Sequence, residues 1–339
     1  MNYYKSDDFN RIKKIDAHFH ANAASDKVLK YLKSKDFKIF SINCDVPYAP
    51  YPTIDKQQEI VQTHQKNLPG LLAYASTISL KNWDSSSWEK ETIAYLDQSF
   101  LKGATAVKLW KNVGMEYQDK DGNYIQVDDP KFDKIIDHIR KQGYPLLGHI
   151  GEPKNCWLPL NEMTVNNDKA YFKAHPEYHM HHHPNCPSYE RIISARDKML
   201  LKNPDLTYVG CHLGSQEWSI DEVAKMFDKH PNYKVDLAHR ICHLQYQSQL
   251  KRDEVRDFMI KYQDRILYGT DIEVFDGDNE KDIINSADKL WKEDWKYFTS
   301  DVTMKVEEVN GVFSGLQLPK EVVDKIYRKN AERWLPGFK

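Results

Sequence analysis

The stretch IKKIDAHFH at residues 12–20 places two histidines at the end of the first predicted strand, Ile12–Ala17. Alternate side chains of a strand share a face, so we expect His18 and His20 to lie together, a few ångströms apart. Two imidazoles in that arrangement can chelate one divalent metal ion. The pair alone is weak support, because 14 histidines among 339 residues give roughly 0.6 such pairs by chance.

Seven more short apolar runs follow, and most are separated by a stretch of helical periodicity. They are Phe37–Asn43, Leu71–Ile78, Ala104–Trp110, Pro145–Ile150, Leu206–His212, Tyr233–Leu237 and Arg265–Thr270. Eight strands alternating with helices predict an α/β fold, the (β/α)8 TIM barrel, as a single domain over residues 1–339. Long loops are expected after the fourth and fifth strands, at residues 111–128 and 151–186, where specificity and lids usually reside.

Three helices begin at sequence signals for a helix start. Asp129 is expected as an N-cap before Pro130, with Gly143 as the left-handed stop. Pro187 and Pro319 are expected to open two more helices. The first two helices lead directly into the fifth and sixth strands.

Composition restricts the partners. The net charge is −2, and the sequence has no long run of charges of one sign, so we expect neither nucleic acid nor a membrane surface as a partner. A small-molecule substrate is the expected partner. No signal peptide or stretch of ~18 apolar residues is present, which predicts a cytoplasmic protein. The five cysteines are scattered without a C-x-x-C pair, which predicts reduced thiols. A homo-oligomer is left open.

Three further candidate ligands fall at the ends of other predicted strands. His149 ends the fifth strand, His212 the sixth and Asp271 the eighth. The carboxyl ends of barrel strands surround one mouth, where catalytic residues lie, and imidazoles with a carboxylate suit zinc and its first-row neighbours. Cys211, beside His212, is an alternative nucleophile, although a buried structural thiol is the preferred interpretation because strand neighbours point to opposite faces.

These residues lie in motifs that resemble the amidohydrolase superfamily. The closest match is its amidohydrolase 2 branch, which contains aminocarboxymuconate-semialdehyde decarboxylase and related metal-dependent hydrolases. The motifs are D-x-H-x-H at 16–20, Lys108 in AVKLW, Gly148-His149, G-x-H-L-G at 210–214, Y-G-T-D at 268–271 and R-K-N-A-E-R at 328–333. Their order and spacing cover nearly the whole chain.

The resemblance implies a role for each residue of the site. His18, His20, His149 and Asp271 would bind one divalent ion, zinc by preference and manganese or another first-row metal as alternatives. His212 would act beside it as general acid or base, with Asp271 also in the catalytic set.

The implied activity is metal-dependent hydrolysis of a small polar or acidic substrate at an amide, ester or lactone carbon, through metal-activated water. The same ligands suit non-oxidative decarboxylation of a small carboxylic acid, and the motifs do not separate the two. A non-enzymatic binding module ranks low, because every expected ligand is present.

Other residues near strand ends have open roles. Lys108 is assigned to substrate binding, with a carbamylated metal bridge or a lysine at the core edge as alternatives. Trp110, Glu152 and Trp157 are candidate pocket walls, and Arg240 is a candidate clamp for a substrate carboxylate, or else a surface ion pair. The histidine tract, made of His179, His181, His182 and His183, is interpreted as a lid or solvated loop rather than a second metal site.

Overall fold

The computed structural model describes residues 2–338 of the chain, and its centre is a parallel β-sheet. Nine strands are joined in the order β8-β7-β6-β5-β4-β3-β2-β1-β9, and every pairing is parallel. The strands are β1 (Lys14–Asn22), β2 (Phe37–Ile42), β3 (Leu72–Thr77), β4 (Ala106–Leu109), β5 (Leu146–Gly148), β6 (Tyr208–Gly210), β7 (Tyr233–Asp236), β8 (Ile266–Leu267) and β9 (Ile272–Phe275). All eight predicted strands occur, and β9 is additional.

The sheet is curled. Strands β8 and β9, at opposite ends of the sheet order, belong to one stretch of chain, residues 266–275. Between them, Tyr268 O accepts a hydrogen bond from Ala17 N at 2.9 Å, and Asp271 N donates to His18 O at 2.8 Å. This stretch therefore lies against both β7 and β1.

Two separate apolar clusters lie on the two sides of the sheet. The inner cluster takes alternate residues from the strands, as a pleated sheet with one enclosed side requires. Its strand members are Ile15, Ala17, Phe40, Ile42, Ala73, Ala75, Ala106, Leu147, Val209 and Leu267. The larger outer cluster, which includes Phe37, Ile39 and Leu72, packs the sheet against the surrounding helices.

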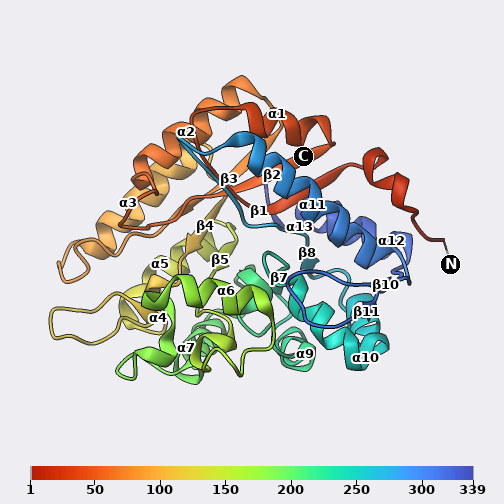
Figure 1. Ribbon diagram of the computed structural model, residues 1–339. Helices are drawn as coiled ribbons and strands as arrows, with labels where there is room; N and C mark the ends of the chain where they lie inside the picture. Colours follow the sequence, from red (N-terminus) through yellow and green to blue (C-terminus); the bar gives the residue numbers. More distant parts are fainter. Residues whose placement is uncertain (1, 339) are drawn as a thin grey trace.

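Helices surround the strands (Figure 1). They are α1 (Lys27–Ser34), α2 (Ile54–Asn67), α3 (Trp88–Leu101), α4 (Asn112–Met115), α5 (Pro130–Lys141), α6 (Asn166–Ala174), α7 (Tyr189–Lys202), α8 (Cys211–Gly214), α9 (Ile220–Lys229), α10 (Ile241–Lys261), α11 (Glu280–Thr299), α12 (Lys320–Asp324) and α13 (Asn330–Trp334). Single turns η1 (Ser6–Arg11), η2 (Lys154–Trp157), η3 (Pro176–Tyr178) and η4 (Met180–His182), the π-turn η5 (Lys325–Lys329) and a hairpin of β10 (Thr303–Met304) with β11 (Phe313–Ser314) complete the chain.

The predicted helix starts are close to those observed. Asp129 caps α5 by accepting a hydrogen bond from Lys131 N, and Gly143 has a positive φ of 76°. In α7 the cap is Ser188, one residue after Pro187, because its hydroxyl accepts from Arg191 N. Pro319 directly precedes α12.

Three further features can be compared with the predictions from the sequence. Strands β5, β6 and β8 end earlier than predicted, so His149, His212 and Asp271 follow them, whereas β1 continues beyond its predicted end to Asn22 and includes His18 and His20. All five cysteines are free thiols, as predicted. No helix among residues 2–338 is long and apolar enough to span a membrane.

Candidate metal centre

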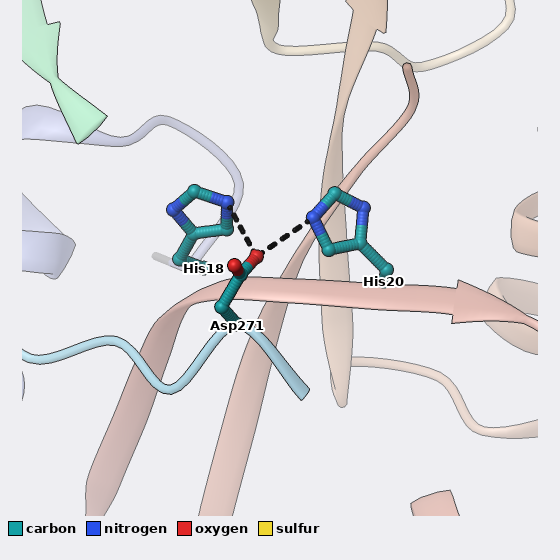
Figure 2. A group of neighbouring side chains, drawn as sticks. All are labelled: His18, His20 and Asp271. Atoms are coloured by element: carbon teal, nitrogen blue, oxygen red, sulfur yellow. Dashed lines mark hydrogen bonds and ion pairs between the residues drawn. The ribbon is translucent and has the colours of Figure 1, made fainter. Parts of the chain in front are cut away.

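Two histidines of β1 and one aspartate form the centre of the candidate site. Oδ1 of Asp271 lies 3.0 Å from Nε2 of His18 and 3.0 Å from Nε2 of His20. Figure 2 shows the two rings on either side of this carboxylate. The three ligand atoms lie within 4.8 Å of one another, which is the grouping that a divalent cation needs.

An irregularity in β1 brings both histidines to the inner side. Ile15 and Ala17 belong to the inner cluster, so an unbroken alternation would turn His18 and His20 outward. The register with β2 shifts between Asp16, which pairs with Ile39, and Phe19, which pairs with Ser41. Strand β1 therefore has one extra residue at this point. A bulge of this kind re-aims side chains next to a site, and here it directs the histidine pair at Asp271.

Asp236, at the end of β7, fixes the ring of His18. Its Oδ2 lies 2.8 Å from Nδ1 of His18, and its Oδ1 accepts from the backbone N of His212 at 2.8 Å. A carboxylate on Nδ1 holds the proton there and leaves the lone pair on Nε2, which faces Asp271. Asp236 was not among the residues predicted from the sequence. Its position at the end of a predicted strand, where the candidate ligands also lie, was the sequence feature that could have identified it.

His212 is held in a left-handed turn immediately after β6. His212, Leu213 and Ser215 have φ values of 59°, 56° and 57°, which are costly for residues other than glycine. Nδ1 of His212 lies 2.9 Å from the carbonyl oxygen of Ala238, an atom that can only accept, so Nδ1 carries the proton. Nε2 then has the lone pair and lies 3.9 Å from Oδ2 of Asp271.

His149 lies beside His212 rather than within the His18–His20–Asp271 group. The rings of His149 and His212 are 4.2 Å apart between centroids. Nε2 of His149 is buried without a hydrogen bond and lies 3.7 Å from Oε2 of Glu152. The structure thus brings all five predicted residues together, with three as one tight group and His149 and His212 adjacent to it.

The electrostatics of the tight group favour positive charge. Burial alone would lower the pKa of His18, but Asp236 and Asp271 raise it well above its usual value. Burial likewise opposes protonation of His20, but Cys44 and Asp271 outweigh it and raise its pKa to about 10. The surroundings stabilise the protonated, positively charged form of both imidazoles, and the same surroundings would stabilise a bound metal cation.

The adjacent histidines have the opposite tendency. Burial lowers the pKa of His149 to about 4, although Glu152 opposes the shift. Burial, and then the neighbouring His149, lower the pKa of His212 well below its usual value. Both rings are therefore neutral at pH 7 and each has a free lone pair, for a metal or for a proton.

A cavity of about 710 Å³ includes this group in its lining. Of the predicted substrate residues, Lys108, Trp110, Glu152 and Arg240 line it. Trp157 is not among the lining residues that the structure describes, and its Nε1 donates to the carbonyl oxygen of Pro187. The wall is rich in aromatic side chains, namely Tyr48, Tyr51, Trp110, Tyr171, Phe172 and Tyr178.

Lys108 and Cys211 contact each other inside the sheet. Both are fully buried, and Nζ of Lys108 donates to Sγ of Cys211 at 3.0 Å. Cys211 belongs to the inner cluster, whereas His212 turns toward Asp271, so the two neighbours face different surroundings. The lysine is also close enough to Asp236 to help lower the pKa of that carboxyl.

The histidine tract forms part of the loop after β5. His179 Nε2 lies 2.8 Å from the carbonyl oxygen of Leu158, and His183 Nε2 lies 3.1 Å from that of Pro176. His175 and Glu177, just before the tract, line the cavity. The loop therefore contributes to the cavity wall through residues that the sequence analysis did not select.

The chain is similar to known proteins in its sequence pattern and in its fold. A family model described as Amidohydrolase matches residues 85–337. A dihydroxybenzoic acid decarboxylase from Polaromonas, solved with bound manganese and the inhibitor 2-nitroresorcinol, is similar in structure with a TM-score of 0.57 and 11% identity over 95% of this chain and 96% of that chain. No curated protein sequence matches significantly.

Two other solved structures have the same fold. The 2,6-dihydroxybenzoate decarboxylase from Rhizobium has a TM-score of 0.54 and 14% identity, over 95% of this chain and 98% of that chain. An uncharacterised TIM-barrel protein from Bordetella bronchiseptica has a TM-score of 0.53 and 15% identity, over the same two shares. At these identities the likeness concerns the fold alone.

Proposed function

The chain belongs to the amidohydrolase family, and on this premise we propose that it is a metal-dependent hydrolase that acts on a small polar or acidic substrate at an amide, ester or lactone carbon. One observation carries the proposal. Nε2 of His18 and Nε2 of His20 both lie 3.0 Å from Oδ1 of Asp271, and Nε2 of His212 lies 3.9 Å from Oδ2 of the same carboxylate. The two candidate metal ligands of β1 and the candidate proton acceptor His212 thus surround the same carboxylate group.

The proposal includes a closed (β/α)8 barrel in a single domain over residues 1–339. The hydrogen bonds from β1 to the stretch between β8 and β9, and the enclosed inner cluster, support closure. The TIM-barrel protein of the same fold supports it as well. In a closed barrel the ends of all strands surround one mouth, which accounts for the convergence of residues from β1, β5, β6 and β8.

The residues present fit a divalent ion. We assign His18, His20, His149 and Asp271 as its ligands, because the first two and Asp271 form a group that favours positive charge and His149 is neutral and adjacent. Zinc or manganese suits this set of imidazoles and carboxylate, and the manganese in the Polaromonas decarboxylase supports a first-row metal. A bound zinc ion lowers the pKa of water to about 7, which supplies a nucleophile at neutral pH.

His212 then handles the proton. Because Nδ1 is committed to the carbonyl of Ala238, Nε2 is the atom that accepts a proton from water as it attacks the substrate carbon. Its spacing of 3.9 Å from Oδ2 of Asp271 is one that a hydrogen-bonded water molecule can bridge. The same Nε2–H can afterwards donate the proton to the leaving group.

Non-oxidative decarboxylation is the second candidate, and the cavity wall favours it specifically. Aromatic side chains that include Tyr48, Tyr51 and Trp110 suit a planar substrate, and Arg240 suits its carboxylate. Two decarboxylases of dihydroxybenzoates share the fold. In this reaction Nε2 of His212 would first take a proton from a substrate hydroxyl or from water and then deliver it to the ring carbon that loses CO2.

One assay separates the candidates. We expect zinc- or manganese-loaded protein to hydrolyse esters, lactones or amides, with acid release from esters and lactones followed by a pH indicator in weak buffer and the amine freed from amides measured directly. Release of CO2 from dihydroxybenzoates without hydrolysis would replace the proposal by decarboxylation. Metal-loaded protein that turns over neither class would instead support a binding module.

Metal content is the first testable prediction. We expect one divalent ion per chain by elemental analysis, because four ligands converge without a bridging group. Lys108→Ala should keep this stoichiometry, since Nζ of Lys108 donates to Sγ of Cys211 and Lys108 is not among the four assigned ligands. Two equivalents that fall to none in Lys108→Ala would instead make Lys108 a bridge.

Substrate binding gives a second prediction, at Arg240. Its side chain lines the cavity and is buried, and its Nε is a donor without a hydrogen-bond partner in the described structure. Arg240→Lys keeps the charge but loses the planar fork, and we expect KM to rise roughly 10- to 100-fold with little change in kcat. Arg191→Lys, at a half-exposed ion pair with Asp128, is the matched control. Equal KM values in both variants would remove Arg240 from the binding site.

A further inference from the structure

Glu152 occupies an unusual position three residues after His149. Gly151 between them has a φ of +85°, and a Cβ there would lie 3.2 Å from Cγ2 of Ile192. The turn that only glycine makes easily folds the chain back, so that the carboxylate of Glu152 approaches the ring of His149. The side chain of Glu152 is only 4% exposed.

Three groups from three strand ends surround this carboxylate. Oε1 accepts a hydrogen bond from Nζ of Lys111, which follows β4. Oε2 lies 3.7 Å from Nη2 of Arg240, which follows β7, and 3.7 Å from Nε2 of His149, which follows β5. Glu152 is therefore the anion shared by two cations of the cavity wall and one candidate metal ligand.

Lys111 keeps the carboxylate in place. Its Nζ lies 4.4 Å from the ring centroid of Tyr178 and 5.6 Å from those of Trp110 and Tyr171. A buried ammonium in an aromatic cage has few alternative positions, and a buried charge retains its partner because separation would leave both uncompensated. The pair thus fixes one oxygen of Glu152.

The other oxygen faces an imidazole that needs an acceptor. Nε2 of His149 is buried and has no hydrogen bond in the described structure. A buried ring nitrogen without a partner costs free energy, and the carboxylate at 3.7 Å is an acceptor within a small side-chain adjustment. A proton held on Nε2 leaves the lone pair on Nδ1, where a metal can bind.

The surroundings of Glu152 suit an orienting group rather than a second general base, because both carboxylate oxygens face groups of the protein.

We propose that Glu152 is the positioning residue of His149: clamped by Lys111, it holds the imidazole in the tautomer and orientation that present Nδ1 to the metal. The inference rests on the proposed function, in which His149 is a metal ligand. It replaces the sequence-based assignment of Glu152 to substrate binding, because both carboxylate oxygens already face groups of the protein. Outer partners of metal-bound histidines act in this way in other proteins.

Zinc affinity of the purified chain tests the inference. We expect Glu152→Gln to bind Zn²⁺ roughly 10- to 100-fold more weakly than the wild type in a chelator competition, the usual effect of losing such a partner. Its Co²⁺ absorption spectrum should shift, because the ligand geometry changes. Glu152→Asp, which keeps the charge but shortens the reach, should recover part of the affinity.

Glu217→Gln is the matched control. Glu217 is a buried glutamate that influences the pKa of Arg240, and its Oε1 accepts a hydrogen bond from Lys154 N, so its variant should bind Zn²⁺ like the wild type. If Glu152→Gln fails to fold because Lys111 is left unpaired, the double variant Glu152→Gln/Lys111→Met removes both charges and should show the same weakening.

Three outcomes have different meanings. Folded Glu152 variants with wild-type Zn²⁺ affinity and an unchanged Co²⁺ spectrum would overturn the positioning role and leave the proposed function intact. A wild-type protein that takes up neither ion would overturn the proposed function itself. Equal weakening in Glu152→Gln and Glu217→Gln would reduce the effect to loss of buried charge, and would also reject the inference.

Discussion

His20→Ala is expected to lose its metal and its activity together. Nε2 of His20 is one of two imidazole nitrogens at 3.0 Å from Oδ1 of Asp271, and alanine removes it without a replacement. Even outer partners of a metal site change affinity by about 10- to 100-fold, so losing a direct ligand should weaken it by more than a hundredfold. Metal analysis after dialysis, with activity measured on the same samples, provides the test.

The variant should remain folded. Metal at a hundred times its dissociation constant stabilises a native protein by about 2.7 kcal/mol, and His20→Ala should lack this metal-dependent rise in Tm. His64→Ala is the control, because His64 is equally buried but its Nε2 donates to the carbonyl oxygen of Ala23, away from the cavity lining. It should lose stability yet keep its metal. A fully metallated, active His20→Ala protein would refute the ligand assignment.

His212→Asn should separate catalysis from metal binding. The amide of asparagine can still donate to the carbonyl of Ala238, but the lone pair at the position of Nε2 is lost. We expect metal content to stay near one ion per chain and kcat to fall by about 10² to 10⁴, the usual loss when a general acid or base is removed. Circular dichroism with metal analysis verifies that fold and site persist.

The pH profile provides a second measurement on the same variant. An unperturbed imidazole would place the ascending limb of the wild-type rate near pH 6.5. Because burial and His149 lower the pKa of His212 well below that value, the base is already neutral at pH 7. The rate should therefore rise with pH through an acidic range below 6.5 and then level off, and this limb should be missing in His212→Asn. Metal content across the same range separates it from loss of metal in acid.

The opposite pattern would correct the assignment. If His212→Asn releases its metal while His149→Asn keeps it, the two neighbouring rings have exchanged roles. Their centroids are only 4.2 Å apart, so the exchange requires no change of fold. It would also remove the basis for the positioning role of Glu152, which depends on His149 as a ligand.

The sequence by itself determined the family, the parallel α/β fold and the residues that meet at its centre. Strands and helices have different periods of apolar residues, so the alternation of the two elements can be predicted from local sequence patterns. The motifs from D-x-H-x-H to Y-G-T-D identify the family. Caps such as Asp129 act through neighbouring backbone groups, so they too were predictable.

Only the tertiary structure decided how the side chains face one another. The bulge in β1 that turns His18 and His20 to the inner side depends on pairing with β2, which lies more than fifteen residues further along the chain. Asp236 acquires its role from His18 on β1 and Lys111 from Glu152 in the segment after β5, and no local pattern marks such contacts. Burial acts in the same way: it lowers the pKa of His212 because of the residues packed around the ring, and these are brought together by the fold and not by adjacency in the sequence.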